Sequence, residues 1–187
     1  TPTFYEGDIR DKNILEKIFQ NHAIDTVVHF AGLKAVGESC EKPWLYHDNN
    51  IIWSIVLFEV MEEYRVRNIV FSSSATVYAE DNPLPWKEDG KLATKNPYGT
   101  TKLVIEQILQ DYQREKWWHV VSLRYFNPIW AHKSWLIGEN PQGVPNNLLP
   151  YIMQVVVGKE SSVRVYGNDY DTPDGTWVRD YIHVVDL

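Results

Sequence analysis

The chain opens with a helical pattern of apolar positions and continues into a short apolar run. Between Asp11 and Gln20 the apolar side chains share one helical face; they are Ile14, Leu15, Ile18 and Phe19. Residues 26–30 then form a compact run of apolar and β-branched character that ends at Ala31-Gly32, as in a buried strand. This order predicts a helix followed by a strand.

The same alternation occurs twice more along the chain. Pro43 opens a second helical stretch whose centre, residues 51–61, is apolar nearly all round, and residues 68–71 form a second buried run that ends in three serines. Asn96-Pro97 can begin a third helix that continues to residue 115, and residues 120–125 form a third strand. Strands that alternate with helices of this length predict right-handed crossovers and a doubly wound parallel sheet, an α/β domain.

The pattern changes after Pro128. Residues 140–147 are rich in Pro, Gly and Asn, and they are followed by an expected helix near residues 148–157 and an expected short strand at residues 163–166. We therefore place a domain boundary near residue 130, with one domain at residues 1–130 and the next at residues 131–187.

Composition and charge exclude several classes of protein. The 187 residues are 44% hydrophobic and 23% charged, which is typical of a folded domain with a core. The formal charge of -7, without a basic run, indicates no nucleic acid or anionic membrane as partner, and no apolar run has the length of a membrane span. The single Cys40 offers neither an internal disulfide nor a cysteine metal site, no spacing typical of metal ligands occurs, and a reducing, cytoplasmic location is expected.

A tyrosine and a lysine one turn apart lie on the apolar face of the third helix. They are Tyr98 and Lys102. A lysine in such a place commonly extends its methylenes over the edge of the core. Here its ammonium can also reach the phenol and favour the phenolate, which would turn a group of ordinary pKa about 10 into a usable base.

Hydroxyl side chains follow the second strand, at the edge where an open α/β sheet binds its ligand. Ser72, Ser73, Ser74 and Thr76 can satisfy loop backbone groups there. Beside the Tyr98–Lys102 pair, one of them could instead relay a proton from a substrate alcohol. Neither a nucleophile elbow nor a histidine in triad spacing accompanies the serines, so hydrolysis is not predicted.

Six segments together carry a resemblance to a known family. They are residues 30–39, 72–78, 96–99 with Lys102, 124–128, 145–151 and 179–184. In this order they resemble the UDP-glucose 4-epimerases (UDP-galactose 4-epimerases), a family of extended short-chain dehydrogenases/reductases. The resemblance implies a Rossmann-like NAD-binding domain, incomplete here, and the beginning of a smaller UDP-sugar domain. It also implies an internal fragment without the N-terminal glycine-rich loop and the C-terminal part.

The resemblance implies a reaction and a homodimer. Enzymes of this family interconvert UDP-galactose and UDP-glucose by NAD-dependent oxidation at C4 to a 4-keto intermediate, which is reduced again on either face. Tyr98 would be the base, and Lys102 would lower its pKa and bind the nicotinamide ribose. Ser74 and Thr76 would hydrogen-bond the reacting hydroxyl.

The same resemblance implies two sets of binding residues. The cofactor residues are Asp8, Ile9, Phe30, Ala31, Gly32, Leu33, Lys34, Asn49, Ser74, Tyr98, Lys102 and Phe126. The UDP-sugar residues are Ser74, Tyr98, Asn127, Asn146, Asn147, Leu148, Arg164, Val165, Tyr166 and Arg179. Arg179 suits a diphosphate because a guanidinium forks onto phosphate oxygens. Without the resemblance, Asn127 and Asn146 are read as loop residues that satisfy backbone groups.

Two alternatives stay open. One is a related nucleotide-sugar dehydratase or decarboxylase, although relatives of the dehydratase type carry carboxylates where Ala75 and Thr76 stand. The other is a non-catalytic fragment or a redesigned nucleotide-binding domain, because G-x-x-G-x-x-G is absent and the chain alone is expected to bind NAD weakly or not at all.

The eight tryptophans bear on the second alternative. Four of them stand where the family usually has glycine: Trp53, Trp130, Trp135 and Trp177. An indole at a glycine position costs strain or fills space. The others, Trp44, Trp86, Trp117 and Trp118, are expected to pack in the core or on the surface.

Overall fold

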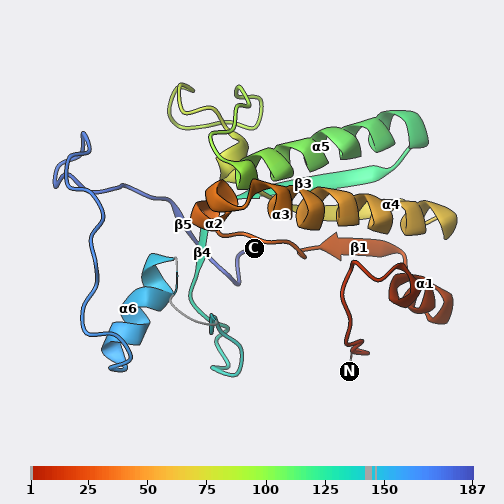
Figure 1. The fold of residues 1–187 in the computed structure, drawn as a ribbon, viewed down its shortest axis with the longest axis horizontal. Helices are drawn as coiled ribbons and strands as arrows, with labels where there is room; N and C mark the ends of the chain where they lie inside the picture. Colours follow the sequence, from red (N-terminus) through yellow and green to blue (C-terminus); the bar gives the residue numbers. More distant parts are fainter. Residues whose placement is uncertain (1, 142–144, 146) are drawn as a thin grey trace. The chain divides into compact units, whose positions relative to one another are not determined.

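The chain divides into two compact units, which are described separately. The computed structural model describes residues 2–141, 145 and 147–187. The first unit extends to Tyr125 and the second comprises Phe126–Leu187 (Figure 1).

A three-stranded parallel sheet forms the centre of the first unit. Its strands are β1 (Thr26–His29), β2 (Asn68–Ser74) and β3 (His119–Tyr125), and they lie in the order β1-β2-β3. All pairs are parallel, with His29 beside Phe71 and Phe71 beside Ser122. The predicted parallel α/β architecture is confirmed. Because the strands are parallel, their carboxyl ends meet at one edge of the sheet.

The helices of the first unit connect these strands as the sequence pattern predicts. They are α1 (Lys12–Asn21), α2 (Val36–Glu41), α3 (Pro43–Tyr46), the π-helical η1 (His47–Ile52), α4 (Trp53–Glu63), the 3₁₀ turn η2 (Ala75–Val77) and α5 (Pro97–Lys116). The second helix predicted from Pro43 is thus a continuous run of α3, η1 and α4. The short helix α2 was not predicted, because six residues show too little periodicity.

The core lies where α4 and α5 run along the sheet (Figure 1). Phe58 and Met61 of α4 meet Ile69 and Phe71 of β2 and Leu109 of α5, and all five side chains are buried. Burying side chains of this size stabilises the fold by roughly 1.5–3 kcal/mol each. On the other face, Val28 and Val121 flank Val70 in register and are about half exposed.

The second unit contains α6 (Leu148–Val156) and two short parallel strands, β4 (Asn127–Ile129) and β5 (Tyr181–His183). The helix was predicted, whereas the strand expected at residues 163–166 is not formed. Val165 and Tyr166 are 70% and 75% exposed, so the apolar pattern of that segment finds no partner strand in the described residues. No helix of the described residues is long and apolar enough to cross a membrane.

Candidate functional site

Tyr98 and Lys102 lie in the first two turns of α5, beside the carboxyl end of β2. Lys102 is 5% exposed, and its Nζ donates a hydrogen bond of 2.7 Å to the carbonyl oxygen of Ser72. The ammonium lies 5.9 Å from the centre of the Tyr98 ring and 5.0 Å from that of Phe71. Burial lowers the pKa of Lys102 to about 8, because desolvation disfavours the charged form.

Ser74 and Thr76 extend this pair into a row of hydroxyl groups. Thr76 donates to Ser74 Oγ through its backbone N, at 3.2 Å, and through its Oγ1, at 3.0 Å. Burial raises the pKa of Tyr98, and a hydrogen bond with Ser74 opposes that rise. The structure thus brings together the four residues expected to be catalytic, while the lowering of the Tyr98 pKa by Lys102 stays a prediction.

The local sequence explains why the first turn of α5 stands at this place. Asn96 caps the helix by accepting a 2.8 Å hydrogen bond from Gly99 N, and Pro97 occupies the first turn. A Cβ on Gly99 would lie only 3.0 Å from the carbonyl oxygen of Thr76. Glycine therefore permits the close approach of α5 to the turn that carries Thr76. Buried Ser39 of α2 accepts a hydrogen bond from Tyr98 N at 3.2 Å.

The segment of residues 30–34 follows β1 at the same edge of the sheet. Its Leu33 is held on both backbone groups by Asn50, which accepts from Leu33 N at 2.8 Å and donates to Leu33 O at 3.0 Å. Asn50 also donates to Thr101 of α5 at 3.1 Å and is 2% exposed. Phe30, 63% exposed, lies nearly parallel to Tyr125, with 6.5 Å between the ring centres.

Sequence reasoning named Asn49 and missed Asn50. Both lie in the π-helical segment η1, a widened turn that is often found at functional sites. Asn49 is partly exposed, whereas Asn50 points into the protein. The sequence shows two adjacent asparagines, and only the helix geometry decides which of them turns inward.

The remaining residues expected to bind the cofactor lie at the surface of the first unit. Asp8 accepts hydrogen bonds from the backbone and side chain of Arg10, which hold its pKa below the ordinary value. Ile9 is partly exposed, and Ala31, Gly32 and Lys34 are exposed. These positions leave the 30–34 segment accessible to a ligand.

Apart from Ser74 and Tyr98, the residues expected to bind the sugar nucleotide belong to the second unit, as does Phe126. Asn127 donates to the carbonyl oxygen of Asp180 at 3.0 Å, which joins β4 to β5, and the Arg179 guanidinium lies 4.0 Å from the centre of the Trp177 ring. Asn147 and Leu148 stand at the start of α6, and Arg164, Val165 and Tyr166 lie in an irregular segment. Asn146 lies outside the described residues. The roles of this set stay predictions.

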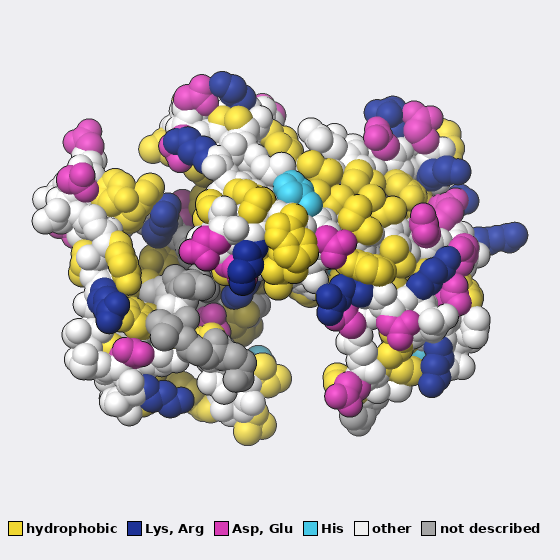
Figure 2. Space-filling view, in the orientation of Figure 1, with side chains coloured by type: hydrophobic (Ala, Val, Ile, Leu, Met, Phe, Trp, Pro, Cys, Tyr) yellow, Lys and Arg dark blue, Asp and Glu magenta, His cyan; other side chains and the backbone are white. Residues whose placement is uncertain are grey.

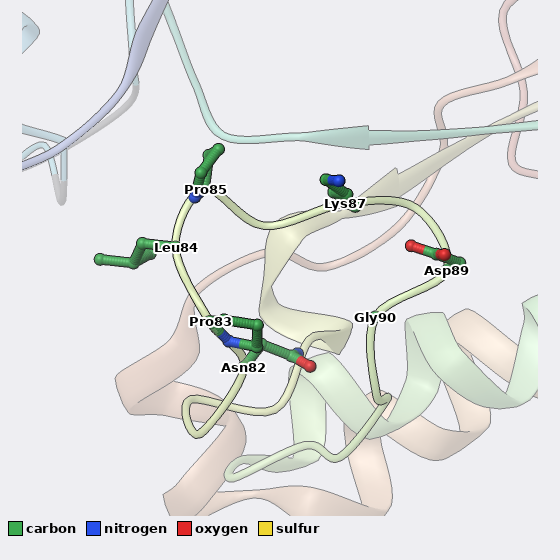
Figure 3. A pocket seen from close by; sticks show the side chains of 7 residues that line it. All are labelled: Asn82, Pro83, Leu84, Pro85, Lys87, Asp89 and Gly90. Carbon is green, nitrogen blue, oxygen red and sulfur yellow. The ribbon is translucent and has the colours of Figure 1, made fainter.

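A hollow lies elsewhere, in the loop of residues 82–90 (Figure 3). Asn82 joins the two ends of this loop by hydrogen bonds with the backbone of Ala79 and Lys91. None of the residues expected in the site lines this hollow. Among the described residues, no group of His, Cys, Asp and Glu side chains could hold a metal ion.

A parallel α/β sheet whose carboxyl edge gathers a tyrosine, a lysine and a serine defines a Rossmann-fold protein of the dehydrogenase/reductase type. More narrowly, the chain belongs to the NAD dependent epimerase/dehydratase family, whose family model matches residues 1–187. This match covers both units of the structure.

The curated relatives most similar in sequence include several UDP-glucose 4-epimerases. The chain is 56% identical to a UDP-glucose 4-epimerase of Cyamopsis tetragonoloba over 186 residues, which are 99% of this chain and 53% of that protein. It is 58% identical to a UDP-glucose 4-epimerase of Neisseria meningitidis serogroup C, covering 98% and 55% of the two chains. The chain therefore spans about half the length of the curated relatives it matches.

Solved structures of UDP-glucose 4-epimerases are also similar to this chain, in both fold and sequence. A UDP-glucose 4-epimerase of Bifidobacterium longum in complex with NAD⁺ and UDP superposes with a TM-score of 0.93 at 55% identity, covering 97% of this chain and 55% of that one. A UDP-glucose 4-epimerase of Stenotrophomonas maltophila, with bound NAD and formylated UDP-arabinopyranose, also gives 0.93 at 51% identity, covering 99% and 55%.

Proposed function

We propose that the complete protein containing this chain is a UDP-glucose 4-epimerase, which interconverts UDP-galactose and UDP-glucose with NAD as cofactor. The observation that carries the proposal is the grouping of Tyr98, Lys102, Ser74 and Thr76 at one sheet edge, within a chain 51–58% identical to proteins of that name. The grouping of these four residues alone would fit any short-chain dehydrogenase. The sequence identity to UDP-glucose 4-epimerases supports epimerisation in particular.

The first unit fits a nicotinamide dinucleotide. Lys102 is a buried ammonium with three N–H donors, and within the described residues it donates one hydrogen bond, to Ser72. Its remaining donors can serve the hydroxyls of a ribose. The accessible Phe30 ring and the exposed backbone of residues 31 and 32 offer an adjoining surface. Lys102, Asn49 and the 30–34 segment would thus hold the cofactor, with Asp8 and Ile9 near its adenine end and Phe126 as a further contact.

Bound NAD supplies a hydride acceptor and donor for carbon 4 of the hexose. In the proposed reaction Tyr98 accepts the proton of the 4-hydroxyl when the hydroxyl is oxidised, and it returns the proton when the ketone is reduced. Ser74 hydrogen-bonds the reacting oxygen, and Thr76 orients Ser74. Lys102 favours the phenolate of Tyr98 by its charge.

The second unit would hold the UDP-sugar. Arg179 is proposed for the diphosphate, with Asn127, Asn146 and Asn147 for polar groups of the ligand. Leu148 and residues 164–166 complete the proposed set. Dehydration would require an added acid near Ser74, and Ala75 and Thr76 supply none, which favours epimerisation over the dehydratase alternative.

A homodimer is part of the proposal. Apolar side chains gather on the surface over α4 and α5 (Figure 2). Ile52 is 49% exposed, and Ile55 and Val104 are partly exposed outside the core cluster. Apolar surface of this kind is typical of an interface, and we assign it to a second copy of the chain. A cytoplasmic location is proposed from the lone Cys40.

Replacement of Tyr98 by phenylalanine tests the function. Tyr98→Phe in the complete protein removes the proton acceptor but keeps the ring, so kcat should fall by about 10²- to 10⁴-fold. Binding of UDP-galactose, measured by calorimetry, should persist. Tyr112→Phe removes a hydroxyl further along the same helix and should leave kcat unchanged. Full activity of Tyr98→Phe would contradict the assignment of the base.

A further inference from the structure

Glu106 and Arg124 form an ion pair beside the serine-rich end of β2, in which Glu106 is buried and Arg124 is partly buried. Glu106 is 2% exposed, and its two carboxylate oxygens accept from Arg124 Nε at 3.1 and 3.2 Å and from Arg124 Nη2 at 2.8 Å. Ser73, itself 2% exposed, donates its hydroxyl to the same carboxylate. The carboxylate is therefore well supplied with donors, as a buried charge must be.

The pair joins four parts of the first unit. Glu106 belongs to α5, Ser73 to β2 and Arg124 to β3. Arg124 also donates to the carbonyl oxygen of Glu88 at 3.0 Å, and its guanidinium lies 4.9 Å from the centre of the Tyr78 ring. The loop that follows Thr76 is thereby connected to the same carboxylate.

Two side chains one turn apart on α5 hold two consecutive residues of β2. Lys102 binds the carbonyl oxygen of Ser72, and Glu106 binds the side chain of Ser73. Ser73 and Ser74 are consecutive, so a hydrogen bond that holds the Ser73 side chain also restrains the backbone from which Ser74 projects. Ser74 in turn meets Tyr98, which lies on the helix that carries both anchors.

Stability alone gives a weak reason for such an arrangement. Desolvation of two charges offsets most of their attraction, and apolar side chains of similar volume commonly serve a fold equally well. Carboxylate and guanidinium do offer directional hydrogen bonds, which apolar packing lacks. One of them, from the Ser73 hydroxyl to the Glu106 carboxylate, holds the strand residue next to Ser74.

We propose that Glu106, supported by Arg124, is a positioning residue for the reaction: through Ser73 it sets the place of Ser74 relative to Tyr98. The inference rests on the proposed function. A hydroxyl displaced by a fraction of an ångström still permits binding of the sugar nucleotide, but it stabilises the transition state less well.

Ser73→Ala is the sharpest test, because it removes the hydrogen bond to Glu106 and keeps the ion pair. In the complete protein, with UDP-galactose as substrate, kcat should fall by about 10- to 100-fold while KM changes by less than about twofold. Glu106→Gln should lower kcat at least as far. Asp111→Asn is the matched control, since Asp111 pairs with Arg114 on the exposed side of the same helix, and it should leave both constants unchanged.

The outcomes of these experiments distinguish a failure of the positioning role from a failure of the proposed function. If the unaltered protein does not interconvert the two UDP-sugars, the proposed function fails and the positioning role fails with it. If the unaltered protein is active and Ser73→Ala keeps its kcat, or loses only thermal stability, the positioning role alone is overturned. Should Glu106→Gln fail to fold, Ser73→Ala still decides.

Discussion

Trp117 occupies a left-handed backbone position at the C-terminal end of α5. Its φ is 58° and its side chain is 79% exposed, so the indole gives little packing in return for the strain. Glycine is favoured at such a helix end, and we expect Trp117→Gly to stabilise the first unit by about 1 kcal/mol. Trp44→Gly, at an exposed site inside α3, should instead destabilise it. Urea unfolding measures both, and a destabilised Trp117→Gly would contradict the argument.

Two tryptophans at expected glycine positions show the same conformation. Trp130 and Trp135 have φ values of 74° and 62°, which is consistent with a backbone suited to glycine. Trp53 and Trp177 are not among the residues of positive φ. The sequence pattern thus located two strained sites correctly, while Trp117 was expected simply to pack.

His29 gives the first unit a pH-dependent stability. It is 3% exposed at the end of β1, shares a 2.8 Å hydrogen bond with Ser54, and burial together with the nearby Lys102 lowers its pKa to about 4. The unfolded chain binds this proton below pH 6.5 and the folded chain only below about 4. As the pH is lowered from 6.5 to about 4, the free energy of unfolding should therefore fall by up to roughly 1.4 kcal/mol per pH unit, and below about pH 4 it should level off.

The predicted pH dependence of the unfolding free energy has a direct control variant. His29→Gln keeps a hydrogen-bonding side chain but cannot take up a proton, so its unfolding free energy should vary less between pH 6.5 and 4 than that of the unaltered chain. Equal slopes in chemical denaturation would assign the acid sensitivity to other groups.

At the scale of the element, the N-terminal cap of α5 is the feature whose loss we expect to destabilise the helix. Asn96 caps the turn that carries Tyr98 and Gly99, and Asn96→Ala leaves Gly99 N without its partner. The loss should be about 1 kcal/mol of unfolding free energy. Gln110→Ala, at an exposed site in the middle of the helix, should be nearly neutral. Thermal unfolding compares the two, and equal effects would show that the cap is dispensable.

At the scale of the whole molecule, the proposed homodimer is open to a charge test. Ile52→Lys places a charge at the end of η1, directly before α4, where the apolar side chain is 49% exposed, and it should shift the complete protein from dimer toward monomer in sedimentation velocity. Leu84→Lys changes a side chain that is 84% exposed in the 82–90 loop and should leave the dimer intact. A monomeric unaltered protein would contradict the proposed homodimer.

The sequence by itself predicted the three strands of the first unit and the longer helices between them, and it placed Tyr98 and Lys102 on one helical face, because periodicity and caps are local. Ser74 and Thr76 were named from the resemblance to the family. Tertiary structure decided what depends on distant partners. The pairing of β4 with β5 joins segments some fifty residues apart, and residues 163–166 stay irregular despite a strand-like pattern. The inward turn of Asn50 and the Ser73–Glu106–Arg124 cluster are invisible in the sequence, since a buried polar group is defined by the partners that folding brings to it.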